Sequence, residues 1–360
     1  MAAISSSTIL LGQSEREYIL AGCRQDCRLD GRTCHEIRPY VLVQQSTADN
    51  PNSDTAPLIL SHGSARLLSA NSCHDGESTQ LLCSIKAELV QPAQDCPNHG
   101  AVEFHVDTLA AGISRRLCDD LQATLTHLLA SSRNNGSSSG NNHGIVDTSA
   151  LCVLPGVYAW RLQIDVYIVS HAGSLLDAAS RVIRAALQTT KLPTVEVLPT
   201  TATATTSHES QQAETTTTTA AVMVDGDYHH ASYVPGVERG PLIVTVTVLQ
   251  SSLDTTTTTT TNHRPVTCLV LDATAAEEAC ATAQVHVAVV PGTAKDDKTP
   301  TITAVRKTGT GSLPVALLPE ITKLALQQAS KVDTADDAFV RKTSTEPAAT
   351  WLLQGLYDLQ

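Results

Sequence analysis

Residues 160–191 of the chain, WRLQIDVYIVSHAGSLLDAASRVIRAALQTTK, contain two hydrophobic periods in succession. From Trp160 to Ile168 apolar side chains alternate with polar ones, which is the period of a half-buried strand. From Leu175 to Leu187 apolar residues recur at helical spacing. The stretch therefore predicts a strand, a tight turn at 171–173 and a long amphipathic helix.

The predicted helix has start and end signals of its own. Ser174 with Asp177 three residues later indicates a capping box, and Asp177 and Arg181 have the spacing of a favourable ion pair. Lys191 and Pro193 favour an end to the helix. In an enzyme, the turn before such a helix is a natural place for catalytic or phosphate-holding residues, with His171 as a possible base.

Composition limits the function classes. A chain of 360 residues has room for two domains, or for two similar halves around one core. Aromatic residues make up only 3%, so we expect a core of Leu, Val, Ile and Ala. The net charge of −12 argues against an autonomous nucleic-acid binder with a broad basic face. Local basic residues could still contact a phosphate backbone if partner subunits supplied most of the charge.

The ten cysteines are scattered and include no C-x-x-C pair. Their only local cluster, Cys23, Cys27, Cys34 and His35, is a weak zinc signal, so we expect reduced, partly buried thiols and no metal or cofactor. The first 13 residues contain no Lys or Arg and do not resemble a signal peptide, and we expect them to be disordered. No apolar run approaches transmembrane length, which predicts a soluble intracellular protein without membrane partners.

The first half contains further helix and strand signals. Ser14 with Glu17 predicts a capped helix, and strand patterns follow at residues 38–44, 63–69, 80–90 and 100–107, with a hairpin loop between the middle two. Leucines at 117, 121, 125, 128 and 129 predict a helix with Asp119 and Asp120 in its first turn. We interpret these two carboxylates as complements of the helix dipole rather than as catalytic or metal-binding groups.

The second half repeats this style, with strand patterns at 242–249, 266–271, 285–290 and 301–306 and helical patterns at 274–282 and 313–329. Low-complexity sequence at 131–144, 200–221 and 255–261 indicates a loop, a Thr-rich linker and an expanded hairpin loop. The chain is therefore predicted to be an α+β protein of two related halves, 14–199 and 222–332. Residues 333–360 are predicted to be a tail, partly helical near 351–356.

Several short motifs occur in a characteristic order. They are Arg28-Leu29-Asp30-Gly31-Arg32, Gly63-Ser64-Ala65-Arg66, Lys86-Ala87-Glu88, Asp119-Asp120-Leu121, Trp160, Gly173-Ser174-Leu175-Leu176-Asp177-Ala178, Leu192-Pro193, Leu271-Asp272-Ala273-Thr274, Glu277-Glu278-Ala279-Cys280 and Arg306-Lys307-Thr308-Gly309. By this order the chain resembles the ribonuclease PH family over residues 14–332, most closely the inactive type of exosome ring subunit. The resemblance implies two halves of sheet backed by helices, the first like ribosomal protein S5 domain 2. It also implies assembly into a six-membered ring around an RNA channel.

Active members of that family are phosphorolytic 3′→5′ exoribonucleases. They hold phosphate with an Arg and main-chain donors, and they use carboxylates for metal binding or acid–base chemistry. Their Asp-Gly-Gly-Thr-Arg turn corresponds here to residues 171–175, which read His-Ala-Gly-Ser-Leu, and their phosphate-holding Arg corresponds to Ala159. Their acidic signature falls on Glu277 and Glu278, but their later essential Asp corresponds to Gln284, which cannot act as a general base. The resemblance therefore implies no catalytic residues in this chain.

The leading hypothesis is a non-catalytic subunit of the exosome ring that helps to form the channel for RNA degradation and rRNA processing. Implied partners are other ring subunits, cap subunits, associated nucleases and the RNA in the channel. Arg115 and Arg116 lie where the family has a basic residue facing the channel, although a solvated pair or an intersubunit salt bridge is the alternative. Arg28 and Arg32 either contact RNA likewise or brace the N-terminal segment, and bracing is the favoured interpretation. The resemblance also implies residence in the nucleus, with its nucleolus, and in the cytoplasm.

Two other function classes remain open at this stage. One is an active phosphorolytic exoribonuclease, acting alone or at a composite interface to which this chain donates arginines. The other is an adaptor whose Thr-rich inserts recruit other proteins, although such inserts are more often tolerated expansions of surface loops.

Overall fold

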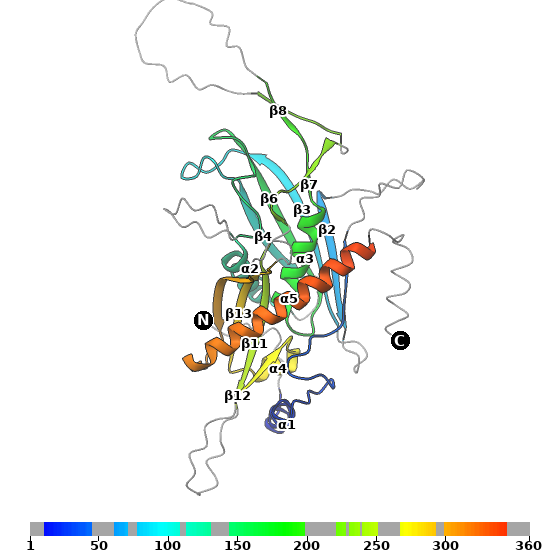
Figure 1. Ribbon diagram of the computed structural model, residues 1–360, viewed down its shortest axis with the longest axis vertical. Helices are drawn as coiled ribbons and strands as arrows, with labels where there is room; N and C mark the ends of the chain where they lie inside the picture. Colours follow the sequence, from blue (N-terminus) through cyan, green and yellow to red (C-terminus); the bar gives the residue numbers. More distant parts are fainter. Residues whose placement is uncertain are drawn as a thin grey trace, which may run out of the picture.

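The structure is a computed structural model, shown in Figure 1, and it describes residues 11–44, 61–70, 78–108, 113–130, 144–198, 221–227, 230–237, 240–250, 267–292 and 299–343. The sequence predictions for 1–10, 71–77, 131–143, 199–220, 255–261 and 351–356 lie outside these ranges. Two sheets, each backed by helices, make up the body of the protein, which confirms the predicted α+β class. The two halves are unequal, because one sheet has six strands and the other has four.

The six-stranded sheet is built around the strand predicted from the opening stretch. That strand is β6 (Tyr158–Ser170), and the sheet order is β1 (Tyr40–Gln44), β2 (Gly63–Ala70), β3 (Ser78–Val90), β6 and β4 (Ala101–Thr108), with β5 (Cys152–Leu154) paired to β6. β4 runs parallel to β6, whereas the other neighbours are antiparallel. The predicted antiparallel pairing of β2 with β3 is therefore confirmed.

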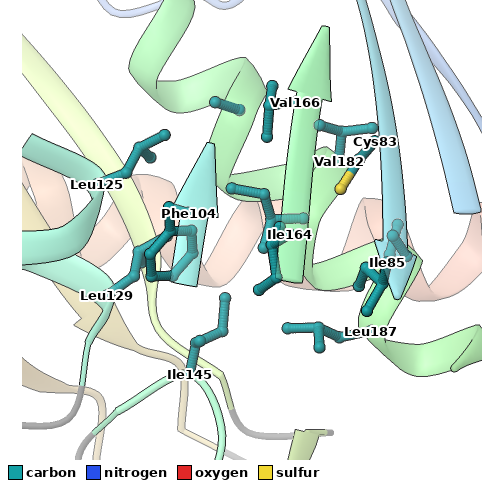
Figure 2. Packing of buried hydrophobic residues seen from close by; sticks show 14 of the residues in the cluster. Cys83, Ile85, Phe104, Leu125, Leu129, Ile145, Ile164, Val166, Val182 and Leu187 are labelled. Atoms are coloured by element: carbon teal, nitrogen blue, oxygen red, sulfur yellow. The ribbon is translucent and has the colours of Figure 1, made fainter. Parts of the chain in front are cut away.

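Two helices cover one face of this sheet: α2 (Arg115–Leu129) and α3 (Leu175–Thr189). The alternation predicted for β6 matches its burial, because Trp160, Leu162, Ile164, Val166 and Ile168 are all buried. Figure 2 shows Ile164 and Val166 of β6 among side chains from both helices, including Leu125, Leu129, Val182 and Leu187. The low aromatic content is reflected in this core, which is mainly Leu, Ile, Val and Ala.

The four-stranded sheet lies on the other side of α3. Its order is β12 (Thr267–Leu271), β11 (Leu242–Gln250), β13 (Ala283–Val290) and β14 (Thr301–Thr308), all antiparallel, and the short helix α4 (Ala275–Cys280) follows β12. Ile243 and Ala288 on one face join the core around α3. The other face packs against α5 (Leu318–Thr343) through Ile321, Ala325 and Ala329. The layers are therefore sheet, helices, sheet and helix.

Helix α5 is longer than the sequence predicted. It follows the 3₁₀ turn Val315–Leu317 and continues to Thr343. Its later part crosses to the first half of the molecule (Figure 1). There Asp333 forms an ion pair with Arg184 of α3, and Asp336 accepts a hydrogen bond of 2.6 Å from the Tyr40 hydroxyl. The prediction of a tail from residue 333 is wrong up to Thr343, because polar contacts with the first half extend the helix.

Smaller elements complete the fold. α1 (Gln13–Arg24) packs on α4 and β12, and β7 (Lys191–Leu192) pairs with β10 (Ser232–Tyr233). β8 (Val195–Leu198) pairs with β9 (Ala221–Val224), and this hairpin projects from the body in Figure 1. Ala221, predicted as the end of the linker, is thus the first residue of a strand.

The predicted helix starts require correction at three places. α1 begins one residue earlier than Ser14, and Gly12 N donates to Glu15 Oε2 at 2.8 Å in place of the predicted Ser14–Glu17 capping box. Ser114 caps α2 by accepting from Leu117 N at 3.3 Å. Asp119 and Asp120 consequently fall in the second turn of α2, beyond the range where the dipole is strongest.

The third correction concerns α3. Ser174 precedes this helix in the left-handed conformation, with φ of 53°, and its side chain does not cap the helix. Asp177 instead accepts hydrogen bonds from Thr245 of β11. Arg181 does not form the predicted ion pair with Asp177, and its guanidinium lies 4.7 Å from the centre of the Tyr40 ring.

The cysteine cluster is divided between core and surface. Cys23 of α1 and Cys34 are buried, with Cys34 Sγ 3.2 Å from the carbonyl oxygen of Cys23, whereas Cys27 is exposed. Within the described ranges, no three His, Cys, Asp or Glu side chains gather as metal ligands. None of the helices in those ranges is long and apolar enough to cross a membrane.

Candidate functional site

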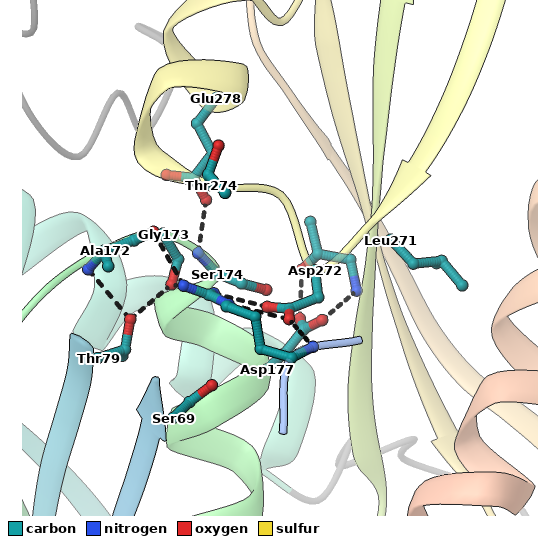
Figure 3. Close-up of polar contacts among 12 residues, drawn as sticks. Ser69, Thr79, Ala172, Gly173, Ser174, Asp177, Leu271, Asp272, Thr274 and Glu278 are labelled. Carbon is teal, nitrogen blue, oxygen red and sulfur yellow. Dashed lines mark hydrogen bonds and ion pairs between the residues drawn. The ribbon is translucent and has the colours of Figure 1, made fainter. Parts of the chain in front are cut away.

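The turn between β6 and α3 packs directly against the segment that joins β12 to α4. Ala275 N donates to the carbonyl oxygen of Ala172 at 3.1 Å. Ser174 N donates to Glu278 Oε1 at 2.9 Å (Figure 3). Gly173 has φ of 112°, and a Cβ there would lie 2.2 Å from the carbonyl oxygen of Ala273. Glycine is therefore required for the two halves to meet this closely.

Asp272 lies at the centre of this junction, with a left-handed φ of 46°. Its carboxylate accepts from the backbone N, Nε and Nη2 of Arg38 at 2.7, 3.0 and 2.6 Å, and from Arg32 Nη1 at 3.1 Å. Burial alone would raise the pKa of Asp272, but the charges and hydrogen bonds of Arg38 and Arg32 outweigh it and lower this pKa. Asp272 is therefore ionised and fully engaged.

Arg38 also holds the turn itself. Its Nη1 and Nη2 donate to the carbonyl oxygens of Ala172 and Gly173, both at 3.0 Å. Thr79 of β3 adds a hydroxyl that donates to Gly173 O at 3.1 Å and accepts from Ala172 N at 3.0 Å (Figure 3). The guanidinium closest to the turn is thus bound to the protein rather than presented to an anion.

Arg28 and Arg32 were predicted either to contact RNA or to brace the N-terminal segment. Both are buried at this junction. Arg28 forms a two-point ion pair with Glu277, Nε to Oε1 at 2.8 Å and Nη2 to Oε2 at 2.6 Å. Its remaining N–H groups donate to the carbonyl oxygens of Glu36, Leu271 and Asp272. Since a guanidinium has five donors, Arg28 has none left for RNA.

Arg32 is engaged in the same way. It donates to Asp30 at 2.7 Å, to Asp272 and to the carbonyl oxygen of Glu36. The side chains of Arg28 and Arg32 are buried and bound within this chain, which favours the predicted bracing over contact with RNA.

Arg115 and Arg116 lie on the surface at the start of α2. Arg115 has acidic neighbours, with Nη1 3.5 Å from Asp107 Oδ1 and Nε 3.5 Å from Asp119 Oδ1. Arg116 is exposed, and its side chain has no ion pair with the residues that the structure describes. Of the four predicted arginines, these two are accessible to a partner.

Several residues of this chain correspond to catalytic or phosphate-holding positions of active family members, and the structure does not bring all of them to one site. Ser174 and Leu175 of the turn line a small cavity with Glu278 and Gln284, and its volume is about 20 Å³. Ala159 is fully buried near the opposite end of the 13-residue strand β6. Glu277 points away from the cavity to Arg28. The structure therefore joins the turn, Glu278 and Gln284, and separates Ala159 from them.

Sequence reasoning missed a buried polar network beside this cavity. The Thr245 hydroxyl donates to Asp177 Oδ1 at 2.5 Å and lies 2.9 Å from His286 Nδ1, and His286 Nε2 lies 2.9 Å from the Thr308 hydroxyl. Burial raises the pKa of Asp177 to about 6 and lowers the pKa of His286 to about 3. Threonine and histidine within the otherwise apolar strands 242–249 and 285–290 were the signal that could have revealed it.

His171, considered as a base, lies in the same turn. Its Nδ1 accepts from Gly173 N at 3.1 Å, and burial followed by the nearby charge of Arg38 lowers its pKa to about 4. His171 is therefore neutral at pH 7, and its Nδ1 lone pair is used within the turn.

Comparison with known protein families identifies one matching domain. Residues 57–193 match the RNase PH, 3′ exoribonuclease family, domain 1. Among curated proteins, the chain is similar to "Exosome complex component RRP45" of Danio rerio, with 26% identity over 190 residues, 52% of this chain and 41% of that protein. It is also similar to "Exosome complex component Rrp42" of Sulfurisphaera tokodaii, with 26% identity over 204 residues, 55% of this chain and 64% of that protein. The match thus spans less than two thirds of either relative.

Comparison with solved structures supports the same fold. An "Archaeal exosome core" chain superposes with a TM-score of 0.58 at 19% identity, covering 90% of this chain and 96% of that one. A chain of the Archaeoglobus fulgidus exosome with RNA bound to the active site gives a TM-score of 0.57 at 18% identity, covering 89% and 97%. At this level of identity the likeness concerns the fold.

Proposed function

Because residues 57–193 match the RNase PH, 3′ exoribonuclease family, domain 1, we propose that the chain is a non-catalytic structural subunit of an exosome ring. Relatives named as exosome components and the fold of exosome cores support this proposal. The partners are other RNase PH-like subunits, cap subunits and associated nucleases, with RNA passing through the shared channel. In this role the chain supports RNA degradation and rRNA processing without cleaving RNA itself.

The observation that carries the non-catalytic part is the cavity at the β6–α3 turn. Its volume of about 20 Å³ is room for roughly one water molecule, which is too small for inorganic phosphate beside a nucleotide. The described lining contains no arginine or lysine, and Gln284 stands where the family resemblance places an essential Asp. Phosphorolysis requires cations or oriented donors to hold phosphate, so these residues do not supply that chemistry.

Arg38, like the lining of the cavity, does not supply a donor for phosphate in this proposal. Its guanidinium is within reach of the turn, but Asp272 and the carbonyl oxygens of Ala172 and Gly173 occupy its donors. Releasing it toward a phosphate would leave the ionised, buried Asp272 without its main partner. Such an uncompensated charge is costly, so Arg38 stays a structural group in this proposal.

The RNA contact of the chain is assigned, in this proposal, to Arg115 and Arg116. Both are exposed at the start of α2, and Arg116 forms no ion pair with the described residues. We propose the division into halves at 14–199 and 222–332, with α5 extending across both. The resemblance to eukaryotic exosome components supports residence in the nucleus and cytoplasm.

The test of catalysis uses the purified full-length chain, RNA and inorganic phosphate. We expect no release of nucleoside diphosphates by the chain alone. Release that survives repurification, and that is lost on Glu278→Gln substitution, would overturn the non-catalytic assignment. Activity that appears only when ring partners are added, and that falls on Arg116→Glu substitution, would instead support the composite interface.

A further inference from the structure

Ser174 is a polar residue in an unusual position. It has a left-handed backbone with φ of 53°, its residue surface is 5% exposed, and its Oγ has no hydrogen-bond partner in the described protein. Its backbone N is satisfied by Glu278 Oε1 at 2.9 Å, so the unmet group is the hydroxyl alone. Burying a hydroxyl without a partner costs about 1–3 kcal/mol. A ligand that meets this hydroxyl would remove the penalty.

The cavity beside Ser174 has the size and chemistry of a water site. Its volume is about 20 Å³, and a single water requires roughly 10–15 Å³ on this measure. Ser174, Glu278 and Gln284 line it, together with Thr245 and His286 of the buried network. A buried water normally has two to four polar partners, and the unpartnered Ser174 Oγ is one that this lining offers.

A neighbouring cavity provides an internal comparison. It measures about 10 Å³, is lined entirely by apolar residues, and shares Leu121 and Leu175 with the polar cavity. Apolar cavities of this kind stay dry, since water there would lose its hydrogen bonds. Leu121 and Leu175 therefore border both cavities, of which only one has polar residues in its lining.

We propose that one ordered water molecule occupies the polar cavity and bridges Ser174 Oγ of the α3 turn to the Gln284 amide of β13. The water links the first half of the protein to the second, beside the direct hydrogen bond from Ser174 N to Glu278. It supplies a partner to Ser174 Oγ, which has none within the described chain, and Gln284 lines the same cavity. The inference goes beyond the proposed function and does not depend on it.

The direct test is a crystal structure of the full chain at high resolution. We expect a solvent peak within 3.2 Å of both Ser174 Oγ and the Gln284 side chain, and no peak in the apolar cavity. In solution, the amide proton of Ser174 should show a long-lived nuclear Overhauser contact with water. A direct Ser174–Gln284 hydrogen bond, no solvent peak, or a cation with ligand distances near 2.0–2.5 Å would each overturn the proposal.

A double-mutant cycle tests the bridge energetically. Ser174→Ala and Gln284→Met should each raise the unfolding equilibrium constant on the order of tenfold, because each removes one partner of the water. The double variant should raise it by clearly less than the product of the two single effects, since both remove the same bridge. Ser330→Ala, at an exposed hydroxyl on α5, is the matched control and should combine multiplicatively with Gln284→Met. Independent effects of Ser174→Ala and Gln284→Met would contradict a shared water.

Discussion

Arg28 and Glu277 lie 249 positions apart in the sequence, and their side chains meet in a buried two-point ion pair. Glu277 uses the same carboxylate to accept from Thr274 N at 2.8 Å at the start of α4. The N-terminal segment is thereby fixed to a helix start in the second half. This ion pair engages Arg28 within the fold of the chain.

Substitution Arg28→Met should lower the free energy of unfolding by about 3–5 kcal/mol, because it leaves the buried Glu277 carboxylate without a counter-charge. Arg28→Lys keeps the charge but cannot form both hydrogen bonds, so it should lie between Arg28→Met and the unmodified protein. Urea unfolding measures these differences. Arg115→Met, in an exposed ion pair, is the control and should change stability little. Equal effects of Arg28→Met and Arg115→Met would contradict the bracing role.

The core around β6 should be sensitive to volume. Ile164 is 0% exposed and lies between the helices and the sheet in Figure 2. Ile164→Ala should lower the free energy of unfolding by about 2–5 kcal/mol through reduced burial and a residual cavity. Val315 is 77% exposed, so Val315→Ala should be nearly neutral in the same unfolding experiment. A neutral Ile164→Ala variant would place this residue outside a tightly packed core.

Stability should depend on pH through the buried histidines. The pKa of His286 is lowered to about 3 and that of His171 to about 4, so between these values and about 6.5 the unfolded chain binds more protons. Stability from these two groups is therefore present above pH 6.5 and is lost as pH falls. Asp177, with a pKa raised to about 6, acts oppositely, since its contribution is lost as pH rises from about 4 to 6.

Substitution His286→Gln should accordingly flatten the acid side of the stability profile. Between pH 4 and 6 the slope should fall by about one proton, or roughly 1.4 kcal/mol per pH unit. Urea unfolding at half-unit intervals of pH measures it. An unaltered slope in the His286→Gln variant would mean that His286 is not held neutral.

The later part of α5 should loosen when its hydrogen bond to β1 is removed. Tyr40→Phe deletes the hydroxyl that donates to the buried carboxylate of Asp336, leaving that acceptor without its donor. Hydrogen exchange should become faster at residues 333–337 and stay unchanged at 318–329, which pack on the second sheet. Tyr18→Phe, at a side chain exposed on α1, is the control. Uniform acceleration along α5 would indicate that Tyr40 does not anchor its later part specifically.

RNA binding by an assembled ring should depend on the start of α2. Arg116→Glu should weaken binding and reduce its salt dependence, by about 0.7 in the logarithmic slope for each phosphate of single-stranded RNA that the ring no longer neutralises. Arg115→Glu should have a similar or smaller effect, because Arg115 already has acidic neighbours. Arg24→Glu makes the same charge change at an exposed position on α1. An equal loss of affinity in the Arg24→Glu ring would point to net charge rather than to a specific contact.

Much of the fold was predictable because it depends on local periodicity. The alternation in β6 sets one face toward the core, and the structure buries that face. The apolar stripe of α3 is buried as well, but so are its polar residues, including Arg181 and Arg184, because α3 lies between the two sheets. The helix caps were less predictable. A capping box at Ser174 requires an extended backbone, but the close packing of Gly173 on Ala273 imposes a left-handed one. Asp177 was then free to bind Thr245, a partner 68 positions away that no local pattern indicates.

In the candidate site, too, local segments were predictable, whereas contacts between distant residues were not. Its segments were predictable from the order of motifs, including the turn, Glu278 and Gln284. The sequence did not predict which charged side chains stay accessible. Arg28, Arg32 and Arg38 resemble surface arginines until the fold places Asp272 and Glu277 beside them. The length of α5 was missed for a similar reason, since Asp333 and Asp336 are polar and gain partners only from the first half.

The ion pairs of the N-terminal segment also bear on how the protein is made. A ribosome releases Arg28 and Arg38 long before their partners, which follow 249 and 234 residues later. Until Asp272 and Glu277 emerge, the nascent first half lacks the two carboxylates that these guanidiniums bind in the folded protein. The segment around Arg28 and Arg38 thus takes its final place only after Asp272 and Glu277 have been synthesised, and release of an incomplete chain would leave its guanidiniums without these carboxylates.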